Sequence, residues 1–187
     1  MRIVVSGTHA SGKSTLISDF AARHPEYSVL PDPFELMDEF WDAPGPAMFA
    51  AQLRLAADRL SNGEHGSHLI AERGPLDFLA YLSALEALDE APVSPHLWDR
   101  ATGIVRDSLR LVDLVVVLPL AGSDALVAGA DEHLALREAM NDALLDLIDD
   151  RDVVDERARV VEITGDRGRR LAALEAAVAG STAQKVP

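Results

Sequence analysis

The stretch Gly7-Thr8-His9-Ala10-Ser11-Gly12-Lys13-Ser14-Thr15 has the pattern G-x-x-x-x-G-K-[ST], complete and close to the start of the chain. A short β-branched run, Arg2–Ser6, precedes it, and Ser14–Arg23 follows with apolar residues at helical spacing. The pattern is informative only between a strand and a helix, and the sequence supplies both. It predicts a phosphate-binding loop, because glycines let backbone N–H groups turn inward and a helix N-terminus favours an anion.

Lysine usage supports this interpretation. Of the 17 basic residues only two are lysines, Lys13 and Lys185. At this loop position a compact ammonium suits the β- and γ-phosphates of a nucleotide, whereas a guanidinium is bulkier and planar. The alternative is a glycine-rich turn without a ligand. We expect nucleotide binding by the whole loop, that is by Gly7, Thr8, His9, Ala10, Ser11, Gly12, Lys13, Ser14 and Thr15.

The bulk composition limits the classes of partner and compartment. With 187 residues, 48% of them hydrophobic, the chain is long enough for one globular domain with its own core. A net charge of −14 disfavours a broad surface for a nucleic acid polymer or an anionic membrane. There is no Cys, no room for a signal peptide before the first predicted strand, and no apolar stretch of about 18 residues. We expect a cytoplasmic protein without a membrane segment.

Apolar strands alternate with helical segments along the chain. The predicted strands are Arg2–Ser6, Tyr27–Leu30, His68–Glu72, Asp113–Leu118 and Arg159–Ile163. The predicted helices are Ser14–Arg23, Phe34–Trp41, Ala47–Leu60, Pro75–Leu88, Pro95–Leu111, Asp131–Asp149 and Arg169–Ala179. This alternation predicts a three-layer α/β fold, with a five-stranded parallel sheet covered by helices on both faces. We expect one domain over residues 1–180, with a lid-like segment at 121–137 and a flexible tail at 181–187.

Ligands of parallel sheets lie beyond the carboxyl ends of the strands, so polar residues at those ends are candidate site residues. Glu72 ends an apolar strand, as the acidic residue of a magnesium site would, and Ser14 would supply a hydroxyl ligand. The alternative for Glu72 is a plain ion pair with Arg73. We expect Ser14 and Glu72 to hold Mg²⁺.

Asp32 follows the second strand between Pro31 and Pro33, which stiffen the chain around it. A carboxylate there could accept the proton of a substrate hydroxyl that attacks a γ-phosphate. The alternative is an Asp that merely forms a turn. Glu35 is a competing carboxylate one helical turn further on.

Further candidates line the predicted acceptor side. Arg73 could bridge phosphate and substrate, or form a surface ion pair. Asp77 and Tyr81 are four residues apart and share a helix face, where they could line a substrate pocket or flank the core. Phe34 belongs to an aromatic group between the second and third strands that is typical of a core, although an acceptor site would form in the same region.

The chain resembles the P-loop kinases of small molecules, the deoxynucleoside kinase and nucleoside-monophosphate kinase group, and also kinase-like bacterial proteins of the nicotinamide riboside kinase type. The likeness covers roughly residues 1–178, and the loop Gly7–Thr15 is its specific part. Asp32-Pro33 is similar to the Glu-Pro whose carboxylate acts as base in deoxynucleoside kinases, and here the side chain is shorter. Glu72-Arg73-Gly74 is similar to their Glu-Arg-Ser motif for Mg²⁺ and phosphate, with Gly in place of Ser.

The resemblance also implies roles for two further regions. These kinases keep a lid with two or three arginines where this chain has residues 121–140, and Arg137 is the one arginine there. Thr164-Gly165 and Arg167 resemble the loop beside adenine after the last strand. The resemblance thus implies a P-loop NTPase fold, ATP as cofactor, Gly165 and Arg167 at the nucleotide, and Arg73 and Arg137 stabilising the transferred charge.

The sequence therefore favours an ATP–Mg²⁺-dependent kinase that phosphorylates a hydroxyl of a small molecule, nucleoside-like or a natural product. Lys13, Asp32, Arg73 and Arg137 would carry the chemistry. Two alternatives stay open: a nucleoside-monophosphate kinase, for which the region 31–62 offers only Arg54 and Arg59 as a second phosphate clamp, and a nucleotide-switched regulatory protein without an acceptor. A homodimer would be ordinary for this class.

Overall fold

The computed structural model describes residues 1–36, 45–63, 66–120, 134–155 and 158–183. Its sheet has five strands, all parallel, in the order β2-β3-β1-β4-β5. Their bounds are β1 (Arg2–Ser6), β2 (Ser28–Leu30), β3 (Leu69–Glu72), β4 (Leu114–Val117) and β5 (Arg159–Glu162). The predicted fold class is confirmed.

The helices alternate with the strands along the chain. They are α1 (Lys13–Arg23), α2 (Pro46–Ser61), α3 (Pro75–Ala87), α4 (Pro95–Leu109), α5 (Leu134–Asp149) and α6 (Arg167–Ala183). Three of them, α2, α3 and α4, begin at a proline, whose fixed φ angle suits the first helical position and whose missing N–H is not needed there. On α4 the Ser94 side chain also caps the helix, accepting a hydrogen bond from Leu97 N at 3.2 Å.

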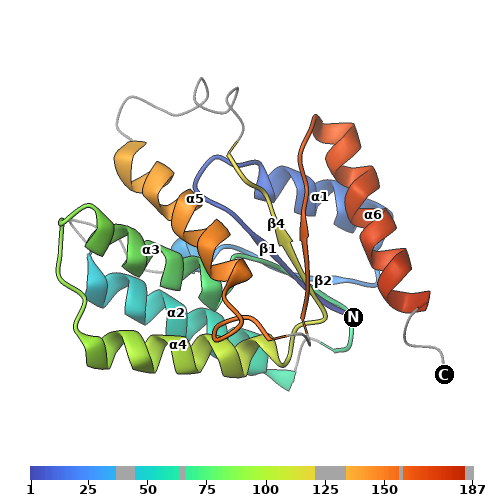
Figure 1. The fold of residues 1–187 in the computed structure, drawn as a ribbon. Coiled ribbons are helices and arrows are strands. Elements are labelled where there is room, and N and C mark those ends of the chain that lie inside the picture. The colour runs from blue at the N-terminus through green and yellow to red at the C-terminus, as the bar shows by residue number, and fades with distance from the viewer. Residues whose placement is uncertain (37–44, 64–65, 121–133, 156–157, 184–187) are drawn as a thin grey trace.

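Helices cover both faces of the sheet (Figure 1). Alternate residues of β1 point to opposite faces, so Ile3 and Val5 pack with α1 and α6, while Val4 packs with the layer formed by α2, α3, α4 and α5. The central strands β1, β3 and β4 are almost wholly buried. The apolar runs of the sequence are therefore explained by burial on both faces.

The strand order places a switch point beside β1. From β1 the chain goes to one side for β2 and β3 and to the other for β4 and β5. The connections diverge at the carboxyl end of β1, where ligands of open α/β sheets bind. The phosphate-binding loop predicted from the sequence starts at this point.

Two predicted segments differ from the structure. Of the helix expected over Phe34–Trp41, the structure describes only the start, and there it has a short 3₁₀ turn, η1 (Pro33–Leu36); residues 37–41 lie outside the described part of the chain. Helix α6 begins at Arg167 and continues to Ala183, so the first residues of the expected tail are helical. Most of the expected lid segment, 121–133, also lies outside the described residues. Within the described part of the chain, no helix is both long and apolar enough to cross a membrane.

Candidate functional site

A cavity of about 610 Å³ opens at the carboxyl edge of the sheet. Its walls come from the phosphate loop, the segment after β2 and the segment after β3, which are neighbours because β2, β3 and β1 are adjacent. All twelve residues that line it were predicted as site residues: His9, Ala10, Gly12, Lys13, Ser14, Thr15, Asp32, Phe34, Glu35, Glu72, Arg73 and Tyr81. The sheet topology therefore brings together residues that are up to 72 positions apart, from His9 to Tyr81.

Two glycines give the phosphate loop its path. Gly12, at the N-terminus of α1, has φ +90°, and Gly7 has φ +151°. A Cβ on Gly7 would lie 2.8 Å from both the Leu118 carbonyl oxygen and Ser11 Oγ. No side chain fits there, which explains the first glycine of the motif. Ser11 Oγ is buried and has no hydrogen-bond partner among the described residues.

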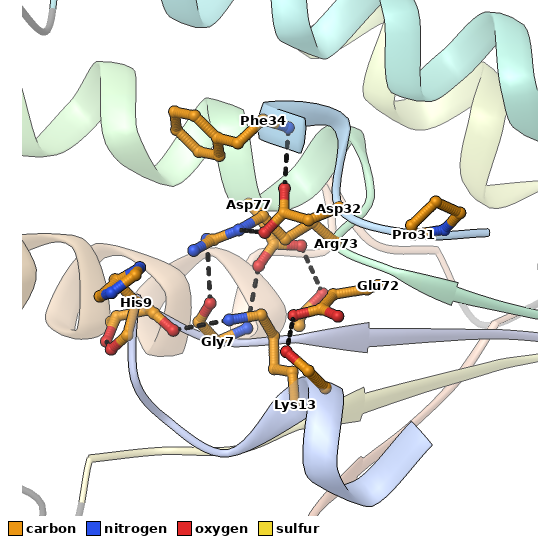
Figure 2. A network of polar contacts seen from close by, with 12 residues as sticks. Gly7, His9, Lys13, Pro31, Asp32, Phe34, Glu72, Arg73 and Asp77 are labelled. Carbon is orange, nitrogen blue, oxygen red and sulfur yellow. Dashed lines mark hydrogen bonds and ion pairs between the residues drawn. The ribbon is translucent and has the colours of Figure 1, made fainter. Parts of the chain in front are cut away.

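Lys13 is buried at the first position of α1. Its Nζ donates a hydrogen bond to Thr8 O at 2.7 Å (Figure 2). Burial, together with the nearby charge of Arg73, lowers the pKa of Lys13 to about 7, although Asp77, Glu72 and Asp32 act in the opposite direction. An anion in the cavity would favour the charged ammonium and raise this pKa.

Ser14 and Glu72 lie side by side, as the sequence predicts for a magnesium site. Ser14 Oγ donates to Glu72 Oε1 at 2.8 Å. Burial raises the pKa of Glu72, and the Ser14 hydrogen bond and the Lys13 charge lower it in part. Arg73 turns to Asp32 and not to Glu72, so the structure does not form the plain Glu72–Arg73 pair. A hydroxyl and one carboxylate oxygen suit Mg²⁺, which keeps waters and binds few protein ligands. Among the described residues there is no group of three or more His, Cys, Asp or Glu side chains that could hold a metal ion.

Asp32 and Arg73 form a buried ion pair at the cavity wall. Arg73 Nε donates to Asp32 Oδ2 at 2.7 Å, and the arginine side chain is only 2% exposed. Asp32 Oδ1 accepts a hydrogen bond from Phe34 N at 3.1 Å, so the turn after β2 orients this carboxylate. The Arg73 guanidinium also donates to Gly7 O at 3.1 Å, which links the base candidate to the phosphate loop.

Aromatic rings surround this ion pair. The Arg73 guanidinium carbon lies 5.3 Å from the Phe34 ring centroid and 5.5 Å from that of Tyr81. Phe34 is 37% exposed and lines the cavity with Tyr81 and Glu35. Tyr81 in turn stacks on Phe49 of α2 with the ring centroids 4.6 Å apart. This side of the cavity is thus lined by the aromatic residues Phe34 and Tyr81 and by the carboxylates of Asp32 and Glu35.

The structure places Asp77 differently from its predicted position. It is fully buried and is not among the described residues that line the cavity. Its carboxylate accepts three hydrogen bonds, from Ser6 Oγ at 2.7 Å and from Gly7 N and Gly74 N, each at 2.9 Å. An acidic residue at the third helical position, turned back to the N-cap N–H, is a known N-terminal signature that the sequence already contained.

Arg137 and Arg167, which the resemblance placed at the nucleotide, lie in different surroundings. Arg137 Nε donates to His9 O at 2.9 Å, so this arginine contacts the phosphate loop from α5. Arg167 instead forms a two-point ion pair with Asp19 on the exposed side of α1 and α6, at 2.6 Å for each contact. It is Arg170, not singled out in the sequence, that reaches the phosphate loop: its Nη1 donates to Ser11 O at 2.6 Å and its Nε to Gly165 O at 2.8 Å.

Solved structures with the same fold include two kinds of kinase. A deoxyadenosine kinase from M. mycoides with the products dCMP and dCDP superposes with a TM-score of 0.70 at 16% identity, over 96% of this chain and 100% of that chain. A thymidylate kinase from Candida albicans superposes with a TM-score of 0.66 at 16% identity, over 96% of this chain and 91% of that chain. At this identity the likeness establishes the fold. No curated protein matches the chain significantly.

The sequence also matches a family model, described as an AAA domain, over residues 2–170, from β1 through the start of α6. The match includes the phosphate loop, the Asp32–Arg73 ion pair, the Ser14–Glu72 pair and Arg170. The chain belongs to this AAA domain family of P-loop proteins.

Proposed function

We propose that the protein is an ATP–Mg²⁺-dependent phosphotransferase that phosphorylates a hydroxyl of a small, nucleoside-like molecule. One observation carries the proposal: the carboxylate of Asp32, held by Arg73, faces the same cavity as Lys13 and the Ser14–Glu72 pair. A protein that only switches with a nucleotide would not need a second carboxylate, fixed by a buried arginine, beside its phosphate loop.

The phosphate end of the cavity suits ATP. Lys13 and the inward N–H groups of the loop would hold the β- and γ-phosphates. Ser14 and Glu72 would hold Mg²⁺, directly or through its waters. When bound, the ion would neutralise charge on the phosphates.

The Asp32 carboxylate would act on the acceptor. It would take the proton from the acceptor hydroxyl as that oxygen bonds to the γ-phosphorus and the bond to the β-phosphate oxygen breaks, leaving ADP. Each carboxylate oxygen has two lone pairs, so the bonds from Arg73 and from Phe34 N leave room for a substrate hydroxyl. Arg73, close to Gly7 O, and Arg137, close to His9 O, would stabilise the charge of the transferred group.

The aromatic wall favours a planar acceptor. Phe34, which is 37% exposed, and Tyr81 line the cavity, and base–aromatic stacking is favourable for every nucleobase. The fold shared with deoxyadenosine kinase supports a nucleoside acceptor, and the fold shared with thymidylate kinase supports a nucleoside monophosphate. For the monophosphate, Arg54 and Arg59 are the clamp candidates, but neither is among the described residues that line the cavity, and Arg59 Nη1 donates to Pro31 O at 2.7 Å. We therefore favour the hydroxyl acceptor.

The test is phosphoryl transfer from ATP labelled at the γ-phosphate. The purified chain is incubated with Mg²⁺ and, in separate reactions, with deoxynucleosides, with deoxynucleoside monophosphates and with no acceptor. Labelled nucleoside monophosphates, absent with Lys13→Ala, support the proposal. Label only in nucleoside diphosphates would assign the chain to the monophosphate kinases. ATP hydrolysis that no acceptor changes would favour the regulatory alternative.

A further inference from the structure

Cationic side chains from three helices and from the turn after β3 donate hydrogen bonds to carbonyl groups of the phosphate loop. Arg73 donates to Gly7 O and Lys13 to Thr8 O. Arg137 donates to His9 O, and Arg170 donates to Ser11 O. Of these four, Arg170, which comes from the last helix, is the one to which the proposed transfer assigns no role.

Arg170 joins two segments that are far apart in the sequence. Its Nη1 contacts Ser11 O at 2.6 Å, and its Nε contacts Gly165 O, in the turn after β5, at 2.8 Å. The two donors of one planar guanidinium thus bind two carbonyl oxygens at once, which a lysine ammonium on a flexible stem does not reproduce. Gly12 follows Ser11 directly, and a Cβ there would lie 2.9 Å from Arg170 Nη1, so the glycine leaves space for the guanidinium.

The contact sets the direction of one peptide plane. The described chain has no cis peptide bond, so the N–H of Gly12 points opposite to the carbonyl of Ser11. Because that carbonyl faces Arg170, the Gly12 N–H faces away from it, on the concave side of the loop, and Gly12 itself lines the cavity. Arg137 makes the same kind of contact two peptides earlier, where its Nε donates to the His9 carbonyl.

We propose that Arg170 is a positioning residue for polyphosphate binding: by holding Ser11 O against the turn at Gly165, it keeps the loop N–H groups directed at the phosphates before the nucleotide arrives. The inference rests on the proposed use of a nucleoside triphosphate. The charge of Arg170 acts through the loop and does not touch the phosphates. Preorganised donors bind an anion without a reorganisation cost, so loss of this contact weakens binding.

The experiment compares Arg170→Ala and Arg170→Lys with Arg169→Ala. Arg169 is the matched control, because it neighbours Arg170, is 82% exposed and pairs with Asp166. Dissociation constants are measured by calorimetry for ATP–Mg²⁺ and for inorganic tripolyphosphate with Mg²⁺. Order of the loop amides at residues 9–13 is measured without nucleotide by ¹⁵N relaxation.

Arg170→Ala should weaken ATP and tripolyphosphate alike, by about tenfold or more, and should loosen the loop amides. The affinities and loop order of Arg170→Lys should lie between those of Arg170→Ala and the wild type, and those of Arg169→Ala should match the wild type. Unchanged loop order and affinity in Arg170→Ala would overturn the inference. A loss for ATP without a loss for tripolyphosphate would also overturn it, because Arg170 would then contact the nucleoside. If the wild type binds no nucleoside triphosphate, the proposed function fails, whereas the loop order still tests Arg170.

Discussion

Individual charged residues at this site act mainly on the backbone. Lys13 donates to Thr8 O, and Asp77 accepts from the N–H groups of Gly7 and Gly74. Buried charges are costly without compensating partners, and each of these has hydrogen-bond partners. The loop is therefore shaped by side chains before any phosphate is present, and its response to pH and to substitution follows from those contacts.

Nucleotide affinity should depend on pH through Lys13. Its pKa of about 7 in the folded chain lies below the usual 10.5, so above pH 7 the ammonium loses its proton while the unfolded chain keeps it. In that window this group makes the unliganded protein more stable as the pH rises, and it makes polyphosphate binding take up a proton. From about pH 8 to about pH 9.5 the affinity for ATP–Mg²⁺ should fall by up to about tenfold per pH unit.

Calorimetry over that pH range measures this dependence, with Lys13→Ala as the control. The variant should bind weakly and show a much shallower dependence, because it lacks the titrating group. The same slope in both proteins would show that another group is responsible.

Glu72→Gln should weaken the magnesium dependence more than the binding of the nucleotide itself. The amide keeps the size of the side chain and can still accept a hydrogen bond from Ser14, but it loses the negative charge that favours the ion and its waters. Mg²⁺ titrations of ATP binding in the wild type and the variant measure the shift. Superimposable titration curves would assign Glu72 a role in local structure only.

At the residue scale, the sequence could not show that Arg170, and not Arg167, contacts the phosphate loop. Three arginines, Arg167, Arg169 and Arg170, stand at the start of α6. Successive positions on a helix differ by about 100°, so which of them faces the phosphate loop depends on where the helix begins and how it packs. The sequence placed the helix start at Arg169, whereas it lies at Arg167.

At the scale of elements, the sequence could predict that candidate site residues directly follow the ends of the strands. The central strands β1, β3 and β4 are buried on both faces and therefore appear as apolar runs. Because all five strands are parallel, polar residues directly after them had to lie at one edge of the sheet. Asp32 and Arg73 follow the adjacent strands β2 and β3, which explains their contact. The sequence could not predict that these two residues contact each other, because Arg73 could equally have paired with Glu72 or pointed into solvent.

Asp77 connects three elements: β1 through Ser6, the phosphate loop through Gly7, and the start of α3 through Gly74. Asp77→Ala would leave these three donors without a partner in a buried place. It should lower the free energy of unfolding by about 3 kcal/mol or more. Chemical denaturation measures this, with the exposed Asp146→Ala as the control, for which about 0.5 kcal/mol or less is expected. A cost as small as that of the control would mean that Asp77 does not join these elements.

At the scale of the whole molecule, the fold places the phosphate loop and the proposed acceptor end on one cavity. The loop after β1 supplies Lys13, and the segments after β2 and β3 supply the Asp32–Arg73 pair and the aromatic wall. The fold is common to kinases of nucleosides and of nucleotides, so it does not by itself select the acceptor. What distinguishes a hydroxyl kinase from a nucleotide switch is whether Asp32 works on a second substrate.

The most direct test of that claim is Asp32→Asn, with acceptor phosphorylation, ATP hydrolysis and ATP affinity measured on the same preparations. The amide keeps the shape of the side chain but is too weak a base, and removal of a general base costs about 10²–10⁴ in rate. Transfer to the acceptor should fall by that factor, ATP affinity should stay close to that of the wild type, and hydrolysis without an acceptor should fall less. Equal transfer rates in the two proteins would contradict the account and would make Glu35 or Glu72 the candidate base.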